Sequence, residues 1–444
     1  RVRFKLKQEV GYLLFIMTGY FADKILKDLW MHGREVVITG MGVVSPIANE
    51  LKLFWEGLKS GRSGISRVQS MEDIDQYPVQ IAGEVRNLDV EKYVDLKESR
   101  KMDPYTIYGM AAASMAVDDA CLSPGSFNPE RTGVLVSSGI GGMQYLQTQH
   151  KKALEGGPKR VSPQLIPQMI TNILSGYISI KYGFKGPNFC ITSACASGTH
   201  SIGEAARMIT YGDADVMLAG GSEASIELLG VAGFAALRAT SRRNDDPEGA
   251  SRPFDKDRDG FVMSEGAGVV ILESREHAES RGANIYCTVA GYGRTGDAYH
   301  ITAPDTSAEQ SARGMALAIE DAGLSISDID YINAHGTSTP YNDKGETKAI
   351  KNVFGNKAYD LAISSSKSMT GHMLGATGAV ESIICALSIR DSVVTPTINY
   401  TTPDPECDLD YIPNKLRKLE VNAALNNSLG FGGHNTTLCF TKTQ

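Results

Sequence analysis

Cys195 has the sequence setting that most favours chemistry. It lies in the segment ITSACASGTHSIGEA, between an apolar run that predicts a strand and a stretch rich in Ala, Ser and Gly that predicts a helix. A thiol at such a bend faces the unpaired N–H groups of the helix N-terminus, which favour the thiolate. The small residues around it leave room for a substrate. Cys190, inside the preceding strand, is instead interpreted as a buried core cysteine, the commoner fate of this residue type.

Two histidines stand in comparable settings, each after a predicted buried strand. His335 opens the polar loop HGTSTPYND, and His372 lies in SMTGHMLG, close after Lys367. A cysteine with one histidine indicates acyl transfer or hydrolysis through a thioester. A second histidine that donates a hydrogen bond can also stabilise an enolate, as carbanion chemistry beside a thioester requires. Lys367 by itself is more typical of a solvated surface lysine.

A glycine-rich loop, GFGG at 430–433, follows one of the last two predicted strands. It offers flexible backbone N–H groups near the thiol, and Phe431 between two glycines has the placement of a gate. A plain glycine turn explains the same pattern. His434, next to this loop, is an intermediate candidate, and the other five histidines have no setting of this kind.

Predicted strands and helices alternate from Arg34 onward, as in an α/β fold. The strand candidates are continuous apolar runs, which is typical of strands covered on both faces. The elements form two series: strands at 35–44, 132–142, 214–224 and 266–274 with helices at 106–120 and 201–211, then strands at 284–295, 328–339, 361–368, 421–433 and 435–442 with helices at 308–322, 345–353 and 376–390.

The two series echo each other. Segment 190–209 resembles segment 363–383, since each is a strand, a Ser-rich bend and a small-residue helix, and the glycine loop SSGIGG has its counterpart in NAHGTST. Two echoes in the same order predict a duplicated α/β unit with halves at 31–284 and 285–444. Two unrelated α/β domains are the alternative. Because no Pro- or Ser-rich linker separates the halves, we expect one body with the site between them.

Composition excludes several classes of protein. The chain has 444 residues, 44 Lys and Arg against 51 Asp and Glu, a formal charge of −7, and 42% hydrophobic residues. This composition is that of a folded globular protein, and its acidity argues against a general nucleic-acid binder. Seven cysteines form no CxxC pair or metal-ligand spacing, which predicts a reducing compartment. No apolar stretch reaches the ~20 residues of a membrane span; the longest candidate, 10–22, is too short.

Residues 1–30 differ from the rest, with six basic and three acidic residues around a short apolar middle. A targeting peptide, an amphipathic surface helix, and a tag or mis-called start are three hypotheses. A secretory signal would need a clear small-residue cleavage site, and the acidic residues argue against a transit peptide. Met31, directly before HGREVVITG, is a second candidate start. This N-terminal extension takes no part in the functional prediction.

Together the motifs resemble those of the β-ketoacyl-[acyl carrier protein] synthases, condensing enzymes of the thiolase fold, and most closely their type II members. The resemblance covers nearly everything from Glu35 to the C-terminus, and seven motifs in family order make it highly specific. They are VVITGMGVVSP, SSGIGG, GPNFCITSACASG, RPFDKDRDGFVMSEGAG, INAHGTSTPYND, SSSKSMTGHMLGATG and NNSLGFGGHN.

The resemblance implies an α/β, thiolase-like fold whose duplicated halves form a layered α-β-α-β-α body. It also implies an acyltransferase that elongates acyl chains on acyl carrier protein by decarboxylative Claisen condensation with malonyl carrier protein, in fatty acid biosynthesis. A ketosynthase of a polyketide cluster and a non-catalytic chain-length partner are alternatives. Such partners lack the nucleophile, however, and Cys195 is present here.

Roles for individual residues follow from the same resemblance. Cys195 is implied to accept the acyl chain as a thioester. His335 and His372 are implied to hydrogen-bond the malonyl thioester oxygen and to stabilise the enolate left by decarboxylation. Lys367 is implied to orient and polarise the histidine site, and Glu346 to support the lysine loop.

The loops around the nucleophile also match the family. The backbone N–H groups of Cys195 and Phe431 are implied to form the oxyanion hole, and Phe431 to gate malonyl entry. Thr337 and Thr339 match threonines that bind the phosphopantetheine arm, and Gly432 is a further substrate-binding candidate.

Ile140 matches the family position at the bottom of the acyl pocket, in a form that resembles enzymes accepting long chains. One departure from the family is Leu429, which stands where Phe is common, two residues before the gate. A basic patch on an acidic protein suits an acidic partner. The residues that match the family's carrier-protein patch are Lys97, Arg100, Lys101 and Arg238.

The resemblance further implies a homodimer, no metal or organic cofactor beyond the carrier's own phosphopantetheine arm, and no nucleic acid. A cytoplasmic location is expected, or an organelle if residues 1–30 are a presequence. A thiolase would need a second catalytic cysteine in a glycine loop, and Cys439 lies in a predicted strand instead. The second histidine argues against a type III synthase, which uses an Asn in that role. A Cys-His hydrolase, which would release free acid, is the remaining alternative.

Overall fold

The computed structural model describes residues 33–443, so the N-terminal extension at 1–30 lies outside the described residues. Within 33–443, nine strands pair into one mixed sheet in the order β4-β5-β6-β1-β7-β13-β12-β8-β9. The strands are β1 (Val36–Val44), β4 (Thr132–Ser137), β5 (Val216–Glu223), β6 (Gly266–Ser274), β7 (Cys287–Gly296), β8 (Tyr331–Asn333), β9 (Ala362–Ser364), β12 (Ala423–Gly430) and β13 (His434–Thr441).

The pairing pattern occurs twice. In the first half β4 runs parallel to β5, which is antiparallel to β6, which is antiparallel to β1. In the second half β8, β12, β13 and β7 repeat this order and these directions. Beyond β8 lies the parallel strand β9, and at the matching place beyond β4, Asn188 makes a parallel bridge with Val134. The halves meet where β1 pairs with β7 over only two residue pairs.

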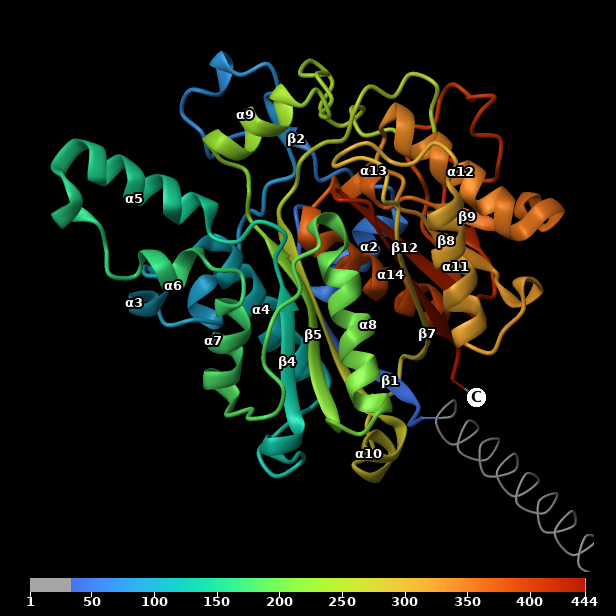
Figure 1. Cartoon of the computed structure of the whole chain (residues 1–444), viewed down its shortest axis with the longest axis horizontal. Coiled ribbons are helices and arrows are strands. Elements are labelled where there is room, and N and C mark those ends of the chain that lie inside the picture. The colour runs from blue at the N-terminus through green and yellow to red at the C-terminus, as the bar shows by residue number, and fades with distance from the viewer. Residues whose placement is uncertain (1–32, 444) are drawn as a thin grey trace, which may run out of the picture.

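Helices divide this sheet into layers. On one outer face α4 (Pro104–Asp119) and α7 (Ile173–Tyr182) cover the first half, and on the other α11 (Glu309–Asp321) and α12 (Pro340–Phe354) cover the second. Between the halves lie α8 (Ser197–Thr210) and α14 (Thr377–Asp391), which contact each other and strands of both halves. Figure 1 shows α8 and α14 at the centre of the molecule. The layered α-β-α-β-α arrangement and the duplication expected from the sequence are therefore present.

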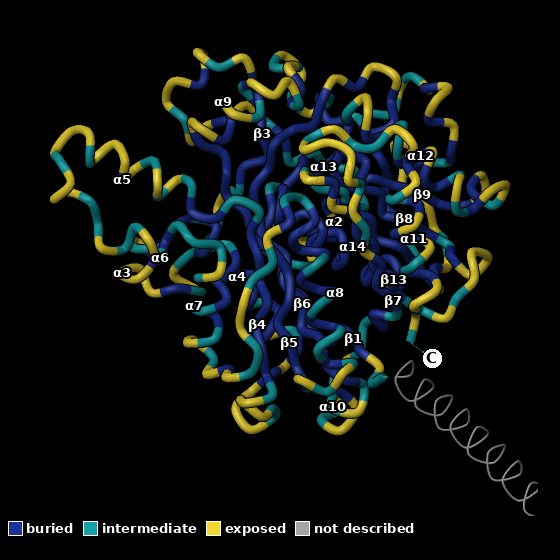
Figure 2. The backbone as a smooth tube through the Cα atoms, viewed as in Figure 1, coloured by how far each residue is buried: buried dark blue, intermediate teal, exposed yellow. Residues whose placement is uncertain are grey.

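Continuous burial explains the continuous apolar runs of the sequence. Every residue of β1, β5 and β6 is buried, as expected for strands covered on both faces. In α14, residues 377–389 are all buried, so this stretch of the helix has no face exposed to solvent. In Figure 2 the central strands form the dark blue interior, whereas α5 (Met143–Gly156) is largely yellow and teal and extends away from the body.

Several elements differ from the predictions. α12 begins at Pro340 rather than near 345, because proline at the first helical position and the Thr339 side chain, which accepts the N–H of Asn342, start the helix there. β8 and β9 have three residues each. The sequence analysis identified none of the smaller elements α2 (Leu51–Lys59), α3 (Leu96–Ser99), α6 (Leu165–Met169), α9 (Leu228–Ala236), α10 (Arg275–Ser280), α13 (Lys367–Thr370), β2 (Ser66–Arg67), β3 (Ile81–Ala82), β10 (Val393–Val394) and β11 (Arg417–Lys418).

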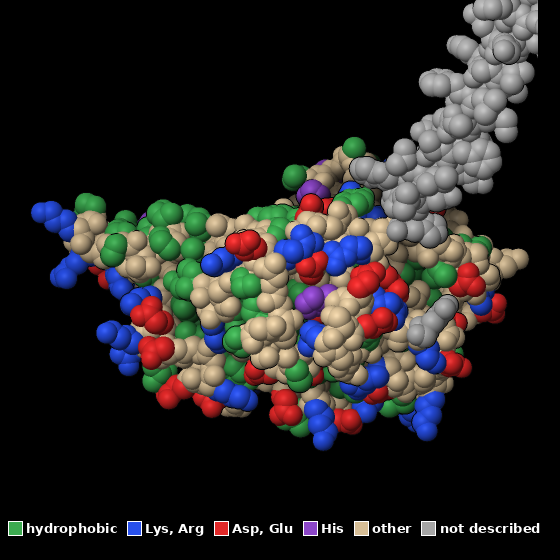
Figure 3. All heavy atoms as spheres, turned by 90° about the horizontal axis from the view of Figure 1, so that it is seen from below, with side chains coloured by type: hydrophobic (Ala, Val, Ile, Leu, Met, Phe, Trp, Pro, Cys, Tyr) green, Lys and Arg blue, Asp and Glu red, His purple; other side chains and the backbone are tan. Residues whose placement is uncertain are grey.

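Surface charge is mixed. On the face in Figure 3, seen from below the view of Figure 1, acidic and basic side chains are interspersed rather than gathered into one basic surface. Among residues 33–443, no helix combines the length and the apolar character that crossing a membrane requires.

Candidate active site

Cys195 is the middle residue of a short 3-10 turn, η5 (Ala194–Ala196), that leads into α8. Ala194 has a φ of 52°, a left-handed conformation that is unusual for a residue with a side chain. The Ser197 hydroxyl fixes the turn, since it accepts the N–H of Ser193 (2.9 Å) and donates to the carbonyl of Ala194 (2.7 Å). The bend predicted from the sequence is therefore a strained turn that the Ser197 hydroxyl holds in place.

Both candidate histidines lie close to this thiol. His372 Nε2 is 3.0 Å from Cys195 Sγ, and the rings of His335 and His372 are edge to face with centroids 5.4 Å apart. His372 precedes α14 and His335 follows β8, so separate motifs bring these groups to one cavity. His372 Nδ1 lies 3.0 Å from the Thr377 hydroxyl, which can donate or accept. Either tautomer of His372 therefore fits its surroundings.

The resting nucleophile is a thiol. Burial raises the pKa of Cys195 to about 12, and the charge of Glu223 raises it further. Lys367 and the backbone N–H groups of Cys195 and Phe431 lower it. The helix N-terminus thus acts in the direction expected from the sequence, but burial outweighs it.

Both imidazoles are neutral near physiological pH. Burial lowers the pKa values of His335 and His372 well below the ordinary value of 6.5, and the positive charge of Lys367 acts in the same direction. A neutral imidazole can accept a proton at one nitrogen or donate an N–H from the other. The site therefore holds a proton acceptor beside the thiol and hydrogen-bond donors for a developing oxyanion.

Lys367 is buried rather than solvated. It begins α13 and is 1% exposed, and its Nζ lies 2.6 Å from Glu381 Oε1 on α14. Burial raises the pKa of Glu381 to about 7, against the effect of the Lys367 charge. The sequence analysis missed Glu381. Its signal was a lone acidic residue in the small and apolar run TGAVESIICALSI, where a buried charge needs a partner.

Glu346 contacts the backbone that carries His335. Its two carboxylate oxygens accept the N–H groups of His335 and Gly336, each at 2.7 Å, and Oε1 also accepts from Asn427 Nδ2 at 3.2 Å. Glu346 is fixed on α12 and 1% exposed. It therefore positions the histidine loop, while the ion-pair partner of Lys367 is Glu381.

A cavity of about 110 Å³ adjoins the thiol. Thr337 and Thr339 line it with their hydroxyls 3.0 Å apart, and Phe431 and Leu429 line it as well. Gly432 is not a lining residue, because its N–H is turned to the carbonyl of Ile301, to which it donates at 2.7 Å. This bond ties the glycine loop to the segment that closes the cavity at Thr302, Ala303 and Pro304.

Ile140 lies in apolar surroundings rather than in this cavity. Together with Cys195 it packs against a cluster made of Val68, Ile74, Ala82, Ile226, Val231, Phe261, Met263 and Leu374. An apolar cluster that contacts the nucleophile is suited to bury a hydrocarbon chain. The role of Ile140 as the bottom of an acyl pocket stays a prediction.

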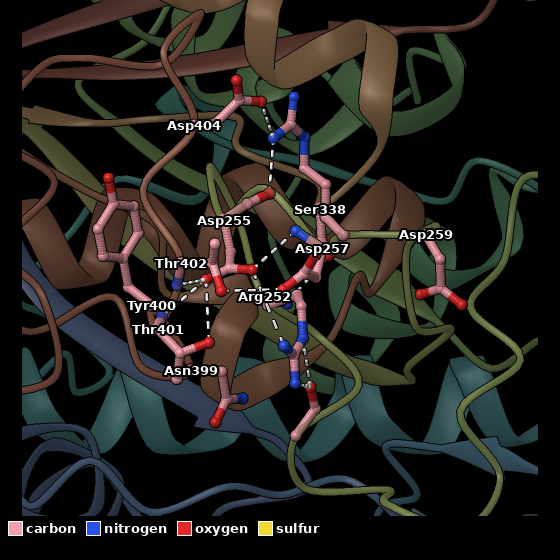
Figure 4. Close-up of polar contacts among 12 residues, drawn as sticks. Arg252, Asp255, Asp257, Asp259, Ser338, Asn399, Tyr400, Thr401, Thr402 and Asp404 are labelled. Atoms are coloured by element: carbon pink, nitrogen blue, oxygen red, sulfur yellow. Dashed lines mark hydrogen bonds and ion pairs between the residues drawn. The ribbon is translucent and has the colours of Figure 1, made fainter.

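The RPFDKDRDG segment (252–260) holds the loop between the two threonines. The N–H of Arg252 donates to the Ser338 hydroxyl (2.9 Å), and the N–H of Gly260 donates to the Ser338 carbonyl (3.1 Å). Ser338 has a φ of 68°, so these bonds stabilise a strained residue. As Figure 4 shows, Asp255 anchors the segment in turn through a neighbouring loop, accepting the N–H groups of Thr401 and Thr402 at 2.7 and 2.6 Å.

The residues of the predicted carrier-protein patch do not form one group in the single chain. Lys97 and Arg100 are exposed around α3, where Lys101 pairs with Glu98 at 2.8 Å. Arg238 is exposed directly after α9. In Figure 1, α3 and α9 lie in different parts of the molecule.

Family models match most of the described chain. The model described as "Beta-ketoacyl synthase, N-terminal domain" matches residues 33–278, and "Beta-ketoacyl synthase, C-terminal domain" matches residues 286–401. The chain is 52% identical over 411 residues to 3-oxoacyl-[acyl-carrier-protein] synthase 2 of Staphylococcus aureus, which covers 93% of this chain and 99% of the relative. It is 50% identical over 412 residues to the protein of the same name from Coxiella burnetii, with the same coverage.

Solved structures show the same fold. A type II polyketide synthase acyl-carrier protein in complex with its ketosynthase superposes with a TM-score of 0.87 at 37% identity, covering 93% of this chain and all of the other. A β-ketoacyl synthase from Burkholderia phymatum superposes with a TM-score of 0.85 at 35% identity and the same coverage.

Proposed function

Because the chain belongs to the β-ketoacyl synthase family, we propose that it is a 3-oxoacyl-[acyl carrier protein] synthase that elongates acyl chains in fatty acid biosynthesis. The observation that carries this proposal is the cavity in which the Cys195 thiol meets two neutral imidazoles, His335 and His372. The 52% identity to a protein named for this activity, over nearly its whole length, supports it.

The first half-reaction transfers the acyl chain to Cys195. Sγ attacks the thioester carbonyl of the acyl carrier protein, and His372 Nε2, 3.0 Å away, accepts the thiol proton. The Thr377 hydroxyl donates to or accepts from Nδ1 as the tautomer changes. The oxyanion forms near the backbone N–H groups of Cys195 and Phe431, the same groups that lower the pKa of the thiol. Collapse of the intermediate releases the carrier's thiol, which takes back the proton.

The second half-reaction forms the carbon–carbon bond. The bond between the malonyl carboxylate and Cα breaks, CO₂ leaves, and its electron pair becomes an enolate on the malonyl thioester. N–H groups of His335 and His372 stabilise the enolate oxygen, and each neutral ring can do so because it carries one N–H donor. The enolate carbon attacks the acyl-Cys195 carbonyl, and expulsion of the Cys195 thiolate gives the 3-oxoacyl product. The thiolate then takes a proton from solvent, which regenerates the thiol.

The same proposal includes the partners. Acyl carrier protein presents both substrates, as a solved relative in complex with its own carrier protein supports. A second copy of the chain pairs along the extended segment 187–192, an edge beyond β4 where Phe189 is 38% exposed. The chemistry above uses only the thiol, the imidazoles, backbone N–H groups and the carrier's arm, so no metal or organic cofactor takes part. The proposed location is the cytoplasm.

A polyketide ketosynthase is the second candidate, because a structure with a TM-score of 0.87 comes from a type II polyketide synthase. The two candidates differ in what they accept. An enzyme of fatty acid biosynthesis elongates a saturated acyl chain once per malonyl unit, whereas a polyketide enzyme extends a chain that still carries oxo groups.

The test supplies purified protein with carrier protein loaded with a saturated acyl chain and with malonyl carrier protein. CO₂ and the 3-oxoacyl product are measured for the wild type and for Cys195→Ala. We expect both products from the wild type and no 3-oxoacyl product from the variant. Free fatty acid without CO₂ would indicate a hydrolase. Turnover only with oxo-bearing chains would favour the polyketide enzyme, and no turnover with any chain would favour a chain-length partner.

A further inference from the structure

Glu223 is a buried carboxylate that the mechanism above does not use. It is the last residue of β5 and 0% exposed. Oε1 accepts from the Ser138 hydroxyl (2.7 Å) and the N–H of Ile140 (3.2 Å). Oε2 accepts from the N–H groups of Gly139 (2.8 Å) and Gly375 (3.0 Å). Four donors fill the four lone-pair sites, and these hydrogen bonds favour the ionised carboxylate against burial, which raises its pKa.

Two of the donors are glycines because the carboxylate lies close against them. A Cβ on Gly139 or on Gly375 would come within 2.8 Å of Glu223 Oε2. Side chains at these positions would displace the carboxylate. The backbone thus forms a site for this one side chain.

The donors come from two parts of the active site. Ile140 belongs to the loop after β4 and packs with Cys195 against the apolar cluster. Gly375 lies in the turn η8 (Leu374–Ala376), between His372 and its hydrogen-bond partner Thr377. One carboxylate therefore connects the loop on the acyl side with the turn on the histidine side.

Glu223 also lies beside the turn that carries the nucleophile. A Cβ on Gly139 would lie 2.8 Å from Glu223 Oε2 and 3.2 Å from the carbonyl oxygen of Ala194, the residue before Cys195. The charged and titratable groups that act on Cys195 are Lys367, which lowers its pKa, Glu223, which raises it, and the neutral His372 and His335 beside it. Removing the charge of Glu223 removes a group that raises the pKa of this thiol, while Lys367 stays paired with Glu381.

We propose that Glu223 is a positioning residue that fixes the loop carrying Ile140 and the turn after His372 relative to each other. We also propose that its negative charge lowers the reactivity of the Cys195 thiol. The inference rests on the proposed function. It predicts that Glu223→Gln changes two separate properties: the reactivity of the thiol and the efficiency of condensation. Glutamine keeps the size of the side chain but turns an NH₂ group toward N–H donors, so at least one of the four bonds is lost.

The first measurement needs no substrate. Iodoacetamide alkylation of Cys195 is followed by mass spectrometry between pH 7 and 9, with the exposed Cys121 as internal reference. We expect alkylation to become about tenfold faster at each pH in Glu223→Gln, corresponding to a thiol pKa lower by about one unit. Glu84→Gln is the matched control, since Glu84 is also buried and accepts the N–H groups of Gln69 and Ser70. An unchanged alkylation rate in Glu223→Gln would overturn the action of the charge on Cys195.

The second measurement is condensation with short- and long-chain acyl carrier protein. We expect Glu223→Gln to lose about tenfold or more in kcat/KM, with the larger loss for the long chain because the Ile140 loop is released. Condensation at the wild-type rate would overturn the positioning role. If Glu223→Gln does not fold, Ser138→Ala replaces it, because this variant removes one of the four donors. We expect its kcat/KM for the long chain to fall about threefold. The wild-type ratio of long-chain to short-chain kcat/KM would overturn the proposal. If the wild type itself does not condense, the proposed function fails, and alkylation still decides on the charge.

Discussion

The turns before α8 and before α14 have nearly the same backbone and different chemical surroundings. Each is a three-residue 3-10 turn that starts with a non-glycine residue at positive φ, 52° at Ala194 and 47° at Leu374, and continues directly into a helix. The middle residue is Cys195 in the first turn and Gly375 in the second. The similarity between segments 190–209 and 363–383 therefore reflects these two turns, which have nearly the same backbone.

What differs is the strand end opposite each turn. β5 ends in Glu223, whose carboxylate accepts the N–H of Gly375. β12 ends in Gly430, where a Cβ would lie 3.4 Å from the Cys195 nitrogen and 2.7 Å from the Ser193 carbonyl oxygen. In one turn a buried carboxylate uses the N–H, and in the other the N–H stays available to the thiol and to substrate. The same backbone becomes a support or a reaction centre according to the residue facing it.

Cys195→Gly makes the first turn chemically like the second and should have the largest effect. Without the nucleophile no acyl-enzyme forms, and we expect condensation to fall by about 1,000-fold or more. Intact-mass measurement after incubation with acyl carrier protein checks this, with Cys121→Ser as the control because Cys121 is exposed. Acyl adduct on the variant would show that another residue is the nucleophile.

Different interactions stabilise the helices that follow the two turns: a buried ion pair on α14 and neutral hydrogen bonds on α8. Removing each interaction compares their contributions to stability. Glu381→Gln leaves the buried Lys367 charge unpaired, so we expect about 3–5 kcal/mol less stability. At the equivalent position of α8, Ser201 makes neutral bonds to the Ser137 hydroxyl (2.6 Å) and the Ser197 carbonyl (2.8 Å). Ser201→Ala should cost about 1 kcal/mol. Urea unfolding of both variants measures the difference, and equal losses would contradict the ion pair's larger role.

Gly430→Ala places a side chain at the strand end facing Cys195. Its Cβ would overlap the Ser193 carbonyl, so we expect about 1–3 kcal/mol of destabilisation and a loss of about 10–100-fold in kcat, because the thiol is displaced from His372. Gly345→Ala on α12 is the control, since a Cβ there has open space. Steady-state kinetics and thermal unfolding check both. Wild-type kcat in Gly430→Ala would show that the turn tolerates movement.

Acid should affect both turns, because burial also lowers the pKa of His200, whose Nδ1 lies 2.8 Å from the Ser193 hydroxyl beside the first turn, to about 4. The pKa values of His335 and His372 in the folded protein lie well below the 6.5 of the unfolded chain, so the unfolded state binds more protons as pH falls. The contribution of these two neutral histidines to the free energy of unfolding is fully present above pH 6.5. It is lost below that pH, by up to about 1.4 kcal/mol per pH unit for each histidine. Urea unfolding at pH 7.5 and 5.5 should show a smaller acid loss for His372→Gln than for the wild type, and the same loss in both would contradict the assignment.

Much of this site could be predicted from the chain. The bends at Cys195 and His372 follow from apolar strands, small residues and helix starts, which are local properties. The role of Lys367 depended on the resemblance, because a lysine in sequence looks solvated and only its partner Glu381 makes it a buried charge. Glu223 gave no local signal at all, since its four donors come from segments about 80 and 150 residues away.

By itself the sequence determined the alternation of strands and helices, the duplication, and the residue types that can do thioester chemistry. These are properties of hydrophobic period, turn chemistry and side-chain functional groups, which nearby residues specify. Only the tertiary structure decided which carboxylate serves which loop and that the resting nucleophile is a thiol. Burial and the pairing of charges depend on groups brought together from both halves, and the cost of removing a charge from water exists only once the chain has folded around it.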